Sequence, residues 1–225
     1  MTLAINTNQM NVVEQMTEAD IAGTSLADPA LYRAYREMTI PAGPEWVEEH
    51  IRRLTAKGIQ VQFQLGSITQ LNTVERMMRR GVCNVPLVLT WVAIGGGAGD
   101  APDLYSLTNF VRAVPDGGVL TLETSMLNVL PVNTMAIALG LHVRCGIEDN
   151  IWTQDRRAKM GSVRQIEQLV RISHELGRAV ANGKEARRIY RIGEFYKNAD
   201  ETLAKNGFAP NRRAGARGFP LRMAA

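Results

Sequence analysis

Residues 143–150 read VRCGIEDN, and this stretch decides both the fold class and the candidate site. An apolar run interrupted by an arginine ends at a glycine, and two carboxylates and an amide follow. The pattern predicts a β-strand that ends in a functional turn, because the carboxyl ends of parallel strands carry the chemistry of many α/β proteins. Glu148 and Asp149 would place a metal ligand beside a general base. An ordinary polar loop and a structural ion-pair network with Arg144 are the alternative interpretations.

Strands and helices alternate along the chain around this stretch. Short runs that are apolar, or that alternate apolar and polar side chains, predict strands, and runs with one apolar helical face predict helices. Such alternation indicates parallel strands joined by right-handed crossovers. The expected strands are residues 2–6, 58–65, 85–93 and 119–123 together with the opening stretch, and the expected helices are residues 45–57, 71–80, 104–114, 132–139, 163–176, 186–195 and 200–204.

Two local features complete this outline. Residues 12–43 contain several proline and glycine breakers, which predict a long loop with one helical turn at residues 31–36. Ser162 and Gln165 match a capping box, with the serine at the N-cap of the helix that follows the opening stretch.

Three glycines, Gly95, Gly96 and Gly97, follow the strand predicted at residues 85–93. Their amides could hold a phosphate or a carboxylate, since glycine lets the backbone approach a ligand closely. A flexible loop is the alternative interpretation. Neither a P-loop nor a dinucleotide-binding glycine pattern is present.

The composition indicates a globular protein of one domain. No run approaches the eighteen apolar residues of a membrane span, and the N-terminus lacks the pattern of a signal peptide, so we expect no membrane partner. Cys83 and Cys145 lie in apolar surroundings, which is typical of reduced thiols in the cytoplasm. The formal net charge of +4 comes from a tail that is expected to be disordered, so binding of nucleic acid is not expected either. The arginines of that tail are Arg212, Arg213, Arg217 and Arg222.

Residues 140–152, GLHVRCGIEDNIW, closely resemble the signature near the end of the β-keto acid cleavage enzymes, a family that includes the 3-keto-5-aminohexanoate cleavage enzyme of lysine fermentation. The resemblance implies a (β/α)8 TIM-barrel fold, of which this chain covers roughly strands four to eight. Further similarity, to the last barrel helix of the family and the short helix after it, lies in residues 166–176, 177–181 and 184–187.

The same resemblance implies an activity and a role for individual residues. Members of the family are expected to condense a β-keto acid with acetyl-CoA, giving acetoacetate and a new acyl-CoA, while a divalent metal, usually zinc, polarises the keto acid. On the matching positions, Glu148 would be a metal ligand, Asp149 the base or its relay, and Arg144 the residue that orients it. The residues expected to line the opening for the keto acid and acetyl-CoA are Gln62, Gln64, Gly95, Gly96, Gly97 and Asn128.

The sequence also departs from the family pattern. The His-x-His pair that would hold the metal is absent, since the only histidines are His50, His142 and His174, and one carboxylate does not hold zinc tightly. Gln62 and Gln64 stand where the family usually has two acids. An amide cannot form an ion pair with a cationic substrate, so the sequence favours a keto acid without an amino group.

The chain begins within an apparent strand, and we therefore expect that the first three barrel strands lie outside this sequence. A partial barrel exposes a sheet edge, which predicts association into a homo-oligomer. Two other interpretations stay open: an inactive barrel fragment with only a binding or structural role, and a metal-independent α/β lyase that uses Arg144, Glu148 and Asp149. The expected organisation is a partial barrel at residues 1–192, a helical extension at residues 193–210 and a basic tail at residues 211–225.

Overall fold

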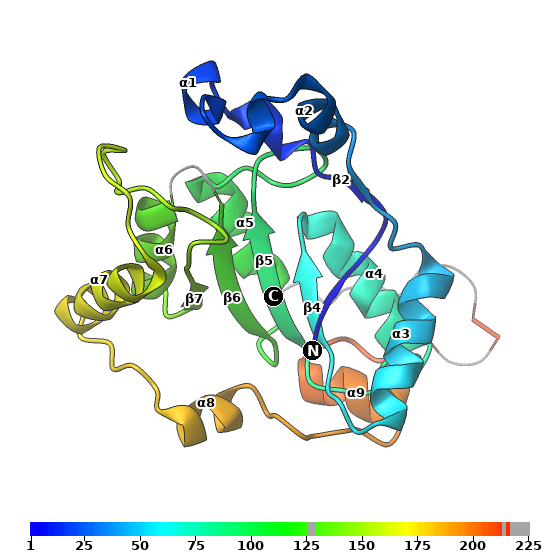
Figure 1. The fold of residues 1–225 in the computed structure, drawn as a ribbon. Helices are drawn as coiled ribbons and strands as arrows, with labels where there is room; N and C mark the ends of the chain where they lie inside the picture. Colours follow the sequence, from blue (N-terminus) through cyan, green and yellow to red (C-terminus); the bar gives the residue numbers. More distant parts are fainter. Residues whose placement is uncertain (126–128, 213–214, 217–225) are drawn as a thin grey trace.

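The computed structural model describes residues 1–125, 129–212 and 215–216, and its centre is a five-stranded parallel sheet (Figure 1). The strands lie side by side in chain order, and each is parallel to its neighbours. Within the described residues the sheet is open, with β1 and β7 at its edges. The strands are β1 (Thr2–Ala4), β4 (Gln62–Leu65), β5 (Val88–Ala93), β6 (Val119–Thr124) and β7 (His142–Arg144).

A helix separates each strand from the next, which confirms the predicted alternation. Helices α3 to α7 surround the outer side of the curved sheet, and its inner face is turned to the viewer in Figure 1. Two short helices, α8 and α9, lie near the amino ends of the strands. The helices are α3 (Pro44–Ala56), α4 (Ile68–Arg79), α5 (Leu104–Ala113), α6 (Val129–Ala138), α7 (Ser162–Glu175), α8 (Gly183–Ile189) and α9 (Ala199–Asn206).

The two faces of the sheet differ in chemistry because side chains alternate along each strand. On the outer face Phe63, Leu89 and Leu122 are fully buried against the helices and form the hydrophobic core. On the inner face the register places polar residues in rows across the strands. One row runs Gln64, Thr90, Thr121 and His142, and the next row runs Val92, Glu123 and Arg144.

Residues 8–40, called the cap here, connect β1 to α3 and lie at the carboxyl ends of the strands (Figure 1). The helix expected at residues 31–36 is present but begins earlier, because Asp28 accepts hydrogen bonds from the first amides and Pro29 suits the first helical position. This helix is α2 (Pro29–Arg36). The other elements were not predicted, since they are too short for a periodic pattern. They are β2 (Asn8–Gln9), β3 (Thr39–Ile40), η1 (Val12–Gln15), α1 (Glu18–Ile21) and η2 (Ser25–Ala27).

The predicted capping box at the start of α7 is wrong. Gly161 is the N-cap residue, and no side chain caps the helix. Ser162 Oγ instead accepts a hydrogen bond from the backbone N–H of Ile147 at 3.1 Å. Gln165 donates to the backbone carbonyls of Asn150 and Met160. Both side chains therefore hold the segment before the helix, because tertiary contacts compete for the groups that a capping box would use.

Helix α9 packs against α4 and belongs to the same folded unit. Leu203 is fully buried, and Asn206 bonds the start of β5 by accepting from Leu87 N–H at 2.8 Å and donating to the Val85 carbonyl at 3.0 Å. The proposed domain boundary at residue 192 stays a prediction. No helix in the described ranges is both long enough and apolar enough to cross a membrane.

Candidate active site

Arg144 is the centre of a cluster of charged side chains at the carboxyl ends of β6 and β7. Glu123 and Arg144 are partners in the register of these strands, so both side chains lie on the inner face. Nη1 of Arg144 lies 2.7 Å from Oε2 of Glu123, and Nη2 lies 2.5 Å from Oε2 of Glu148. Oδ1 of Asp149 lies 3.6 Å from Nη2 of Arg144. One guanidinium therefore faces three carboxylates.

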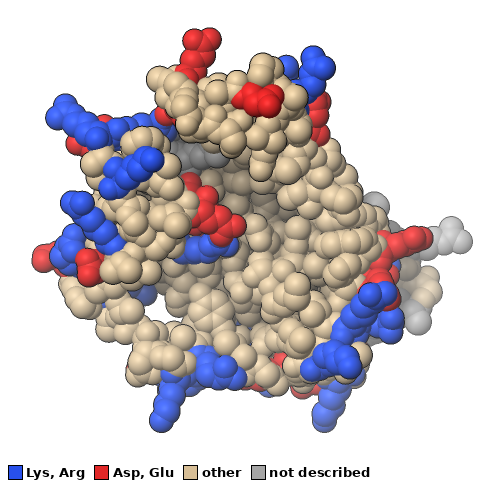
Figure 2. Space-filling view, viewed as in Figure 1, with Lys and Arg blue, Asp and Glu red and all other residues tan. Residues whose placement is uncertain are grey.

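The three acids differ sharply in exposure. The side chains of Glu123 and Asp149 are 4% and 3% exposed, whereas Glu148 is 83% exposed. The side chain of Arg144 is 37% exposed and lies between the buried acids and solvent. In Figure 2 acidic and basic side chains meet at the left margin of a hollow on this face of the molecule. The buried acids lie behind a partly exposed arginine and outside the hydrophobic core.

The buried acids hold a proton at neutral pH. Burial raises the pKa of Glu123 to about 8, and a hydrogen bond and charge repulsion from Asp149 add to this effect. Burial also raises the pKa of Asp149, but the hydrogen bond from Glu123 and the charge of Arg144 oppose the change. These directions favour a protonated Glu123 beside an ionised Asp149 at neutral pH. The two groups form a candidate acid and a candidate base beside the same guanidinium.

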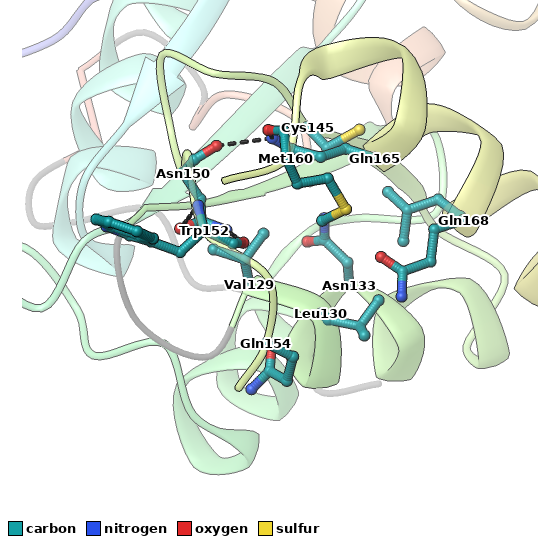
Figure 3. Close-up of a pocket in the computed structure, with 11 residues that line it drawn as sticks. Val129, Leu130, Asn133, Cys145, Asn150, Trp152, Gln154, Met160, Gln165 and Gln168 are labelled. Atoms are coloured by element: carbon teal, nitrogen blue, oxygen red, sulfur yellow. Dashed lines mark hydrogen bonds between the residues drawn. The ribbon is translucent and has the colours of Figure 1, made fainter. Parts of the chain in front are cut away.

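Both neighbouring helices fix the turn that carries Asp149. From α7, the amide of Gln165 donates to the carbonyl of Asn150 at 2.7 Å, a bond drawn dashed in Figure 3. From α6, the amide of Asn133 donates to the carbonyl of Arg144 at 3.1 Å. Asn133 and Gln165 are both buried, so these bonds are shielded from water. The acid pair is consequently held from both sides.

A profile of the β-keto acid cleavage enzymes matches residues 1–192. This chain belongs to that family. Arg144, Glu148 and Asp149 lie in the segment whose sequence resembles the signature of the family, and their roles stay predictions.

Individual members of the family support this assignment. The 3-keto-5-aminohexanoate cleavage enzyme of Acetoanaerobium sticklandii is 27% identical over 138 residues, which cover 61% of this chain and 50% of that enzyme. The 3,5-dioxohexanoate:acetyl-CoA acetone transferase of Paraburkholderia graminis is 24% identical over 140 residues, 61% of this chain and 45% of the transferase. This chain therefore spans about half the length of the curated relatives that it matches.

A solved structure supports the fold assignment. The apo structure of ObcA superposes with a TM-score of 0.51 at 13% sequence identity, covering 86% of this chain and 44% of ObcA. At this identity the likeness concerns the fold alone. The fold class is α/β of the (β/α)8 barrel family, and the described strands form an open part of such a barrel.

The other candidate residues of this β-keto acid cleavage family member lie farther along the inner face. Gln62 donates a hydrogen bond to Thr90 Oγ1 at 2.6 Å, so its amide is occupied within the sheet. Gln64 lines a cavity of about 60 Å³ between the strand ends and the cap, together with Asn8 and Val92. Val92 pairs in register with Glu123, so this cavity and Glu123 lie on the same face of the sheet.

Gly96 and Gly97 let the cap approach the strand ends, whereas a Cβ on Gly95 would lie 3.1 Å from the side chain of Pro102. A Cβ on Gly97 would lie 1.8 Å from the carbonyl oxygen of Gln9, and its φ of +59° also favours glycine. A Cβ on Gly96 would lie 2.9 Å from the carbonyl oxygen of Met10. This packing explains the glycines without a ligand, and contact with CoA or keto acid stays a prediction. Asn128, the last candidate, lies outside the described residues.

Glu123 is the site residue that sequence reasoning missed. It ends the predicted strand at residues 119–123, and a carboxylate at the end of an apolar strand was a usable signal. Its register with Arg144 could not be read from the sequence, because strand pairing depends on the whole sheet.

Glu148 is the family's expected metal ligand, but its surroundings do not fit a metal by themselves. Its carboxylate is exposed and bound to Arg144. His142 lies beside the ring of Tyr190, with centroids 5.3 Å apart. In the part of the chain that the structure describes, no three His, Cys, Asp or Glu side chains lie together as ligands. The role of Glu148 stays a prediction, and no step below depends on a metal.

Proposed function

We propose that this chain takes part in β-keto acid cleavage, in which a β-keto acid condenses with acetyl-CoA and a retro-Claisen step gives acetoacetate and a new acyl-CoA. The observation that carries the proposal is the buried Glu123–Asp149 pair beside Arg144 at the carboxyl ends of β6 and β7. Membership of the family and the names of its relatives support this class of reaction.

Asp149 is the proposed base. Its carboxylate would take a proton from the carbon between the keto and carboxylate groups of the substrate, and the resulting carbanion would attack the thioester carbon of acetyl-CoA. Burial raises the pKa of Asp149, which makes it a stronger base than an exposed aspartate near neutral pH. Glu123, which keeps its own proton while Asp149 is ionised, would orient that carboxylate and supply an acid for the return of a proton.

Arg144 is the proposed anchor for the carboxylate of the keto acid. Its guanidinium is partly exposed, and its fork suits a carboxylate. Nη2 is bound to Glu148, whose side chain reaches solvent freely. An incoming carboxylate would therefore compete with Glu148 for Nη2 and would meet the acid pair directly behind it.

The side chain of the keto acid is proposed to be uncharged. Next to the acid pair, the cavity beneath the cap is lined by apolar groups and amides and by no charged residue. Oδ1 of Asn8 is buried there without a hydrogen-bond partner in the described residues. A substrate group that donates a hydrogen bond would satisfy this oxygen, whereas a charged group would lose its hydration.

The proposal is tested by incubating the full chain with acetyl-CoA and a panel of β-keto acids and detecting acetoacetate and acyl-CoA by mass spectrometry. Asp149→Asn should lower turnover by about 10²–10⁴-fold, the usual contribution of a general base, while the melting temperature stays near that of the wild type. Glu45→Gln, which changes an exposed acid on α3, is the matched control and should keep full turnover.

Two results would refute the proposal. One is a wild-type chain that forms no acetoacetate from any keto acid of the panel. The other is an Asp149→Asn variant that retains turnover. A large loss of stability in that variant would instead identify the cluster as a structural ion-pair network.

A metal-independent lyase is the second candidate function. The acid and base of the Glu123–Asp149 pair need no metal to hold or move a proton, which favours this alternative. The two functions differ in cosubstrate. A lyase would cleave a keto acid in the presence of a chelator and without acetyl-CoA, whereas the acyl transfer reaction would require acetyl-CoA.

A further inference from the structure

A second cavity, of about 110 Å³, lies between α7 and the segment just after the acid pair. Residues 151–160, called the hairpin here, fold back on themselves, since Trp152 and Lys159 form an antiparallel bridge and Met160 N–H donates to the Ile151 carbonyl. The cavity holds several water-sized groups, because one water needs about 10–15 Å³ of such space. It is lined by Thr153, Gln154, Met160, Arg164, Gln168 and Arg171.

The lining is rich in hydrogen-bond donors without partners. Arg164 and Arg171 form no ion pair or hydrogen bond within the described ranges, and the amides of Gln154 and Gln168 form no hydrogen bond there. Arg164, Gln168 and Arg171 are spaced four and three residues apart, so they lie along one side of α7. Thr153 contributes less, because its hydroxyl already donates to Asp155 at 2.6 Å.

The surroundings carry an excess of positive charge. Figure 2 shows Lys and Arg side chains gathered at the left, where α7 lies in Figure 1. The hairpin adds Arg156, Arg157 and Lys159, against Asp155 in the hairpin and Glu167 on α7. The carboxylate of Asp155 is occupied by Thr153 and by backbone N–H groups, which lower its pKa. The lining arginines thus keep their charge available for an anion.

The cavity shares three lining residues with a smaller space that adjoins the turn after Asp149. Gln154, Met160 and Gln168 also line the smaller space shown in Figure 3, and Asn150 lines that space from the other side. Asn150 directly follows Asp149 in the chain. A molecule that reacts at Asp149 could therefore reach the two arginines with a remote part of its structure.

We propose that Arg164 and Arg171 form a binding site for the phosphate monoester of a nucleotide-bearing cosubstrate, of the kind found at the ribose of coenzyme A. Two guanidinium forks and two free amides match the oxygens of a phosphate, which accept several hydrogen bonds at once. The identity of the carrier rests on the proposed function, whereas the anion site itself does not.

The site is tested by isothermal titration calorimetry of the full chain with adenosine 3′,5′-bisphosphate, without any keto acid. Arg164→Gln and Arg171→Gln should each weaken binding about tenfold, which corresponds to about 1.4 kcal/mol. Arg112→Gln, an exposed arginine of α5 without a described partner, is the matched control and should bind like the wild type. Both lining arginines are exposed, so their variants should keep the wild-type melting temperature.

Several outcomes separate the parts of this proposal. No binding by the wild type, or equal weakening by Arg112→Gln, would overturn the site. Inorganic phosphate should bind more weakly than the bisphosphate and at the same two arginines. Equal affinity for both ligands would support an anion site but overturn the nucleotide carrier.

The proposed function and this site can also fail separately. Asp149→Asn should bind the bisphosphate like the wild type, since Asp149 does not line the cavity. If the chain turns over keto acids, Arg164→Gln should raise KM for acetyl-CoA about tenfold and leave kcat unchanged. Bisphosphate binding without turnover would refute only the proposed reaction.

Discussion

The carboxyl ends of β6 and β7 and those of β1 and β4 lie on the same face of one sheet, yet they differ in chemistry. At β6 and β7 the inner face holds Arg144 with two buried acids that share a proton. At β1 and β4 it holds the amide of Gln64 beneath the cap, in a cavity lined by no charged residue, and the amide of Gln62 at the start of β4. Under the proposed function, the groups at β6 and β7 would transfer protons, and the cavity at β1 and β4 would bind the uncharged part of the keto acid.

The charged end should make stability depend on pH. The folded pKa of Glu123 is raised to about 8 from an ordinary value of 4.5, so the folded chain binds a proton that the unfolded chain has released. The stabilising effect is therefore full below about pH 4.5 and is lost as the pH rises through about 8, with a slope of up to about 1.4 kcal/mol per pH unit. Urea unfolding at pH values between 5 and 8 measures this loss of stability.

Glu123→Gln should flatten this slope, because an amide does not titrate and still donates to Asp149. Glu45→Gln, on the exposed side of α3, should leave the slope unchanged. A wild-type chain whose stability rises over this window would show that the buried acids are both ionised.

Removing the cation should be the next largest effect. Arg144→Met leaves Glu123 and Asp149 buried without a positive partner, and the free energy of unfolding at pH 7 should fall by about 3 kcal/mol. The double variant Arg144→Met with Glu123→Gln should recover part of that loss. Arg112→Met provides the comparison, and it should change stability by less than about 0.5 kcal/mol. Equal losses of unfolding free energy in Arg144→Met and Arg112→Met would show that the charged cluster contributes no electrostatic stabilisation of its own.

Substitutions of the glutamines on β4 should lower the free energy of unfolding less than Arg144→Met does. Gln62 and Gln64 form a matched pair for this test. Gln62→Met breaks the hydrogen bond to Thr90 and should cost about 1 kcal/mol of unfolding free energy. Gln64→Met removes an amide that has no partner in the described chain, and stability should stay within about 0.5 kcal/mol. The second variant should instead raise KM for a keto acid. An unchanged KM would exclude Gln64 from substrate binding.

The smallest expected effect concerns metal. Glu148 is the expected ligand, and within the described residues it belongs to no group of three His, Cys, Asp or Glu side chains that could hold a metal. Zinc titration monitored by calorimetry should therefore give the same weak binding for the wild type and for Glu148→Gln. A tight equimolar site that Glu148→Gln abolishes would restore the metal ligand role implied by the family.

The alternation of strands and helices was predictable because each element carries its own period. Gln62-Phe63-Gln64-Leu65 alternates polar and apolar side chains, and the structure places those sets on opposite faces. The turn with Glu148 and Asp149 was predictable from residue types and from the resemblance. Contacts between distant segments were not predictable, as Glu123, the cap and Ser162 show, because register and tertiary competition leave no local pattern.

The contacts of Asn206 with Val85 and Leu87 carry a consequence for how the chain folds during synthesis. These groups are separated by 121 and 119 residues. A ribosome that adds roughly 5–20 residues per second needs on the order of ten seconds to make that interval. Throughout this delay the Val85 carbonyl and the Leu87 N–H, just before the central strand, lack the partners that Asn206 supplies. A chaperone that shields the nascent β5 should therefore raise the yield of folded protein more than one that acts after release.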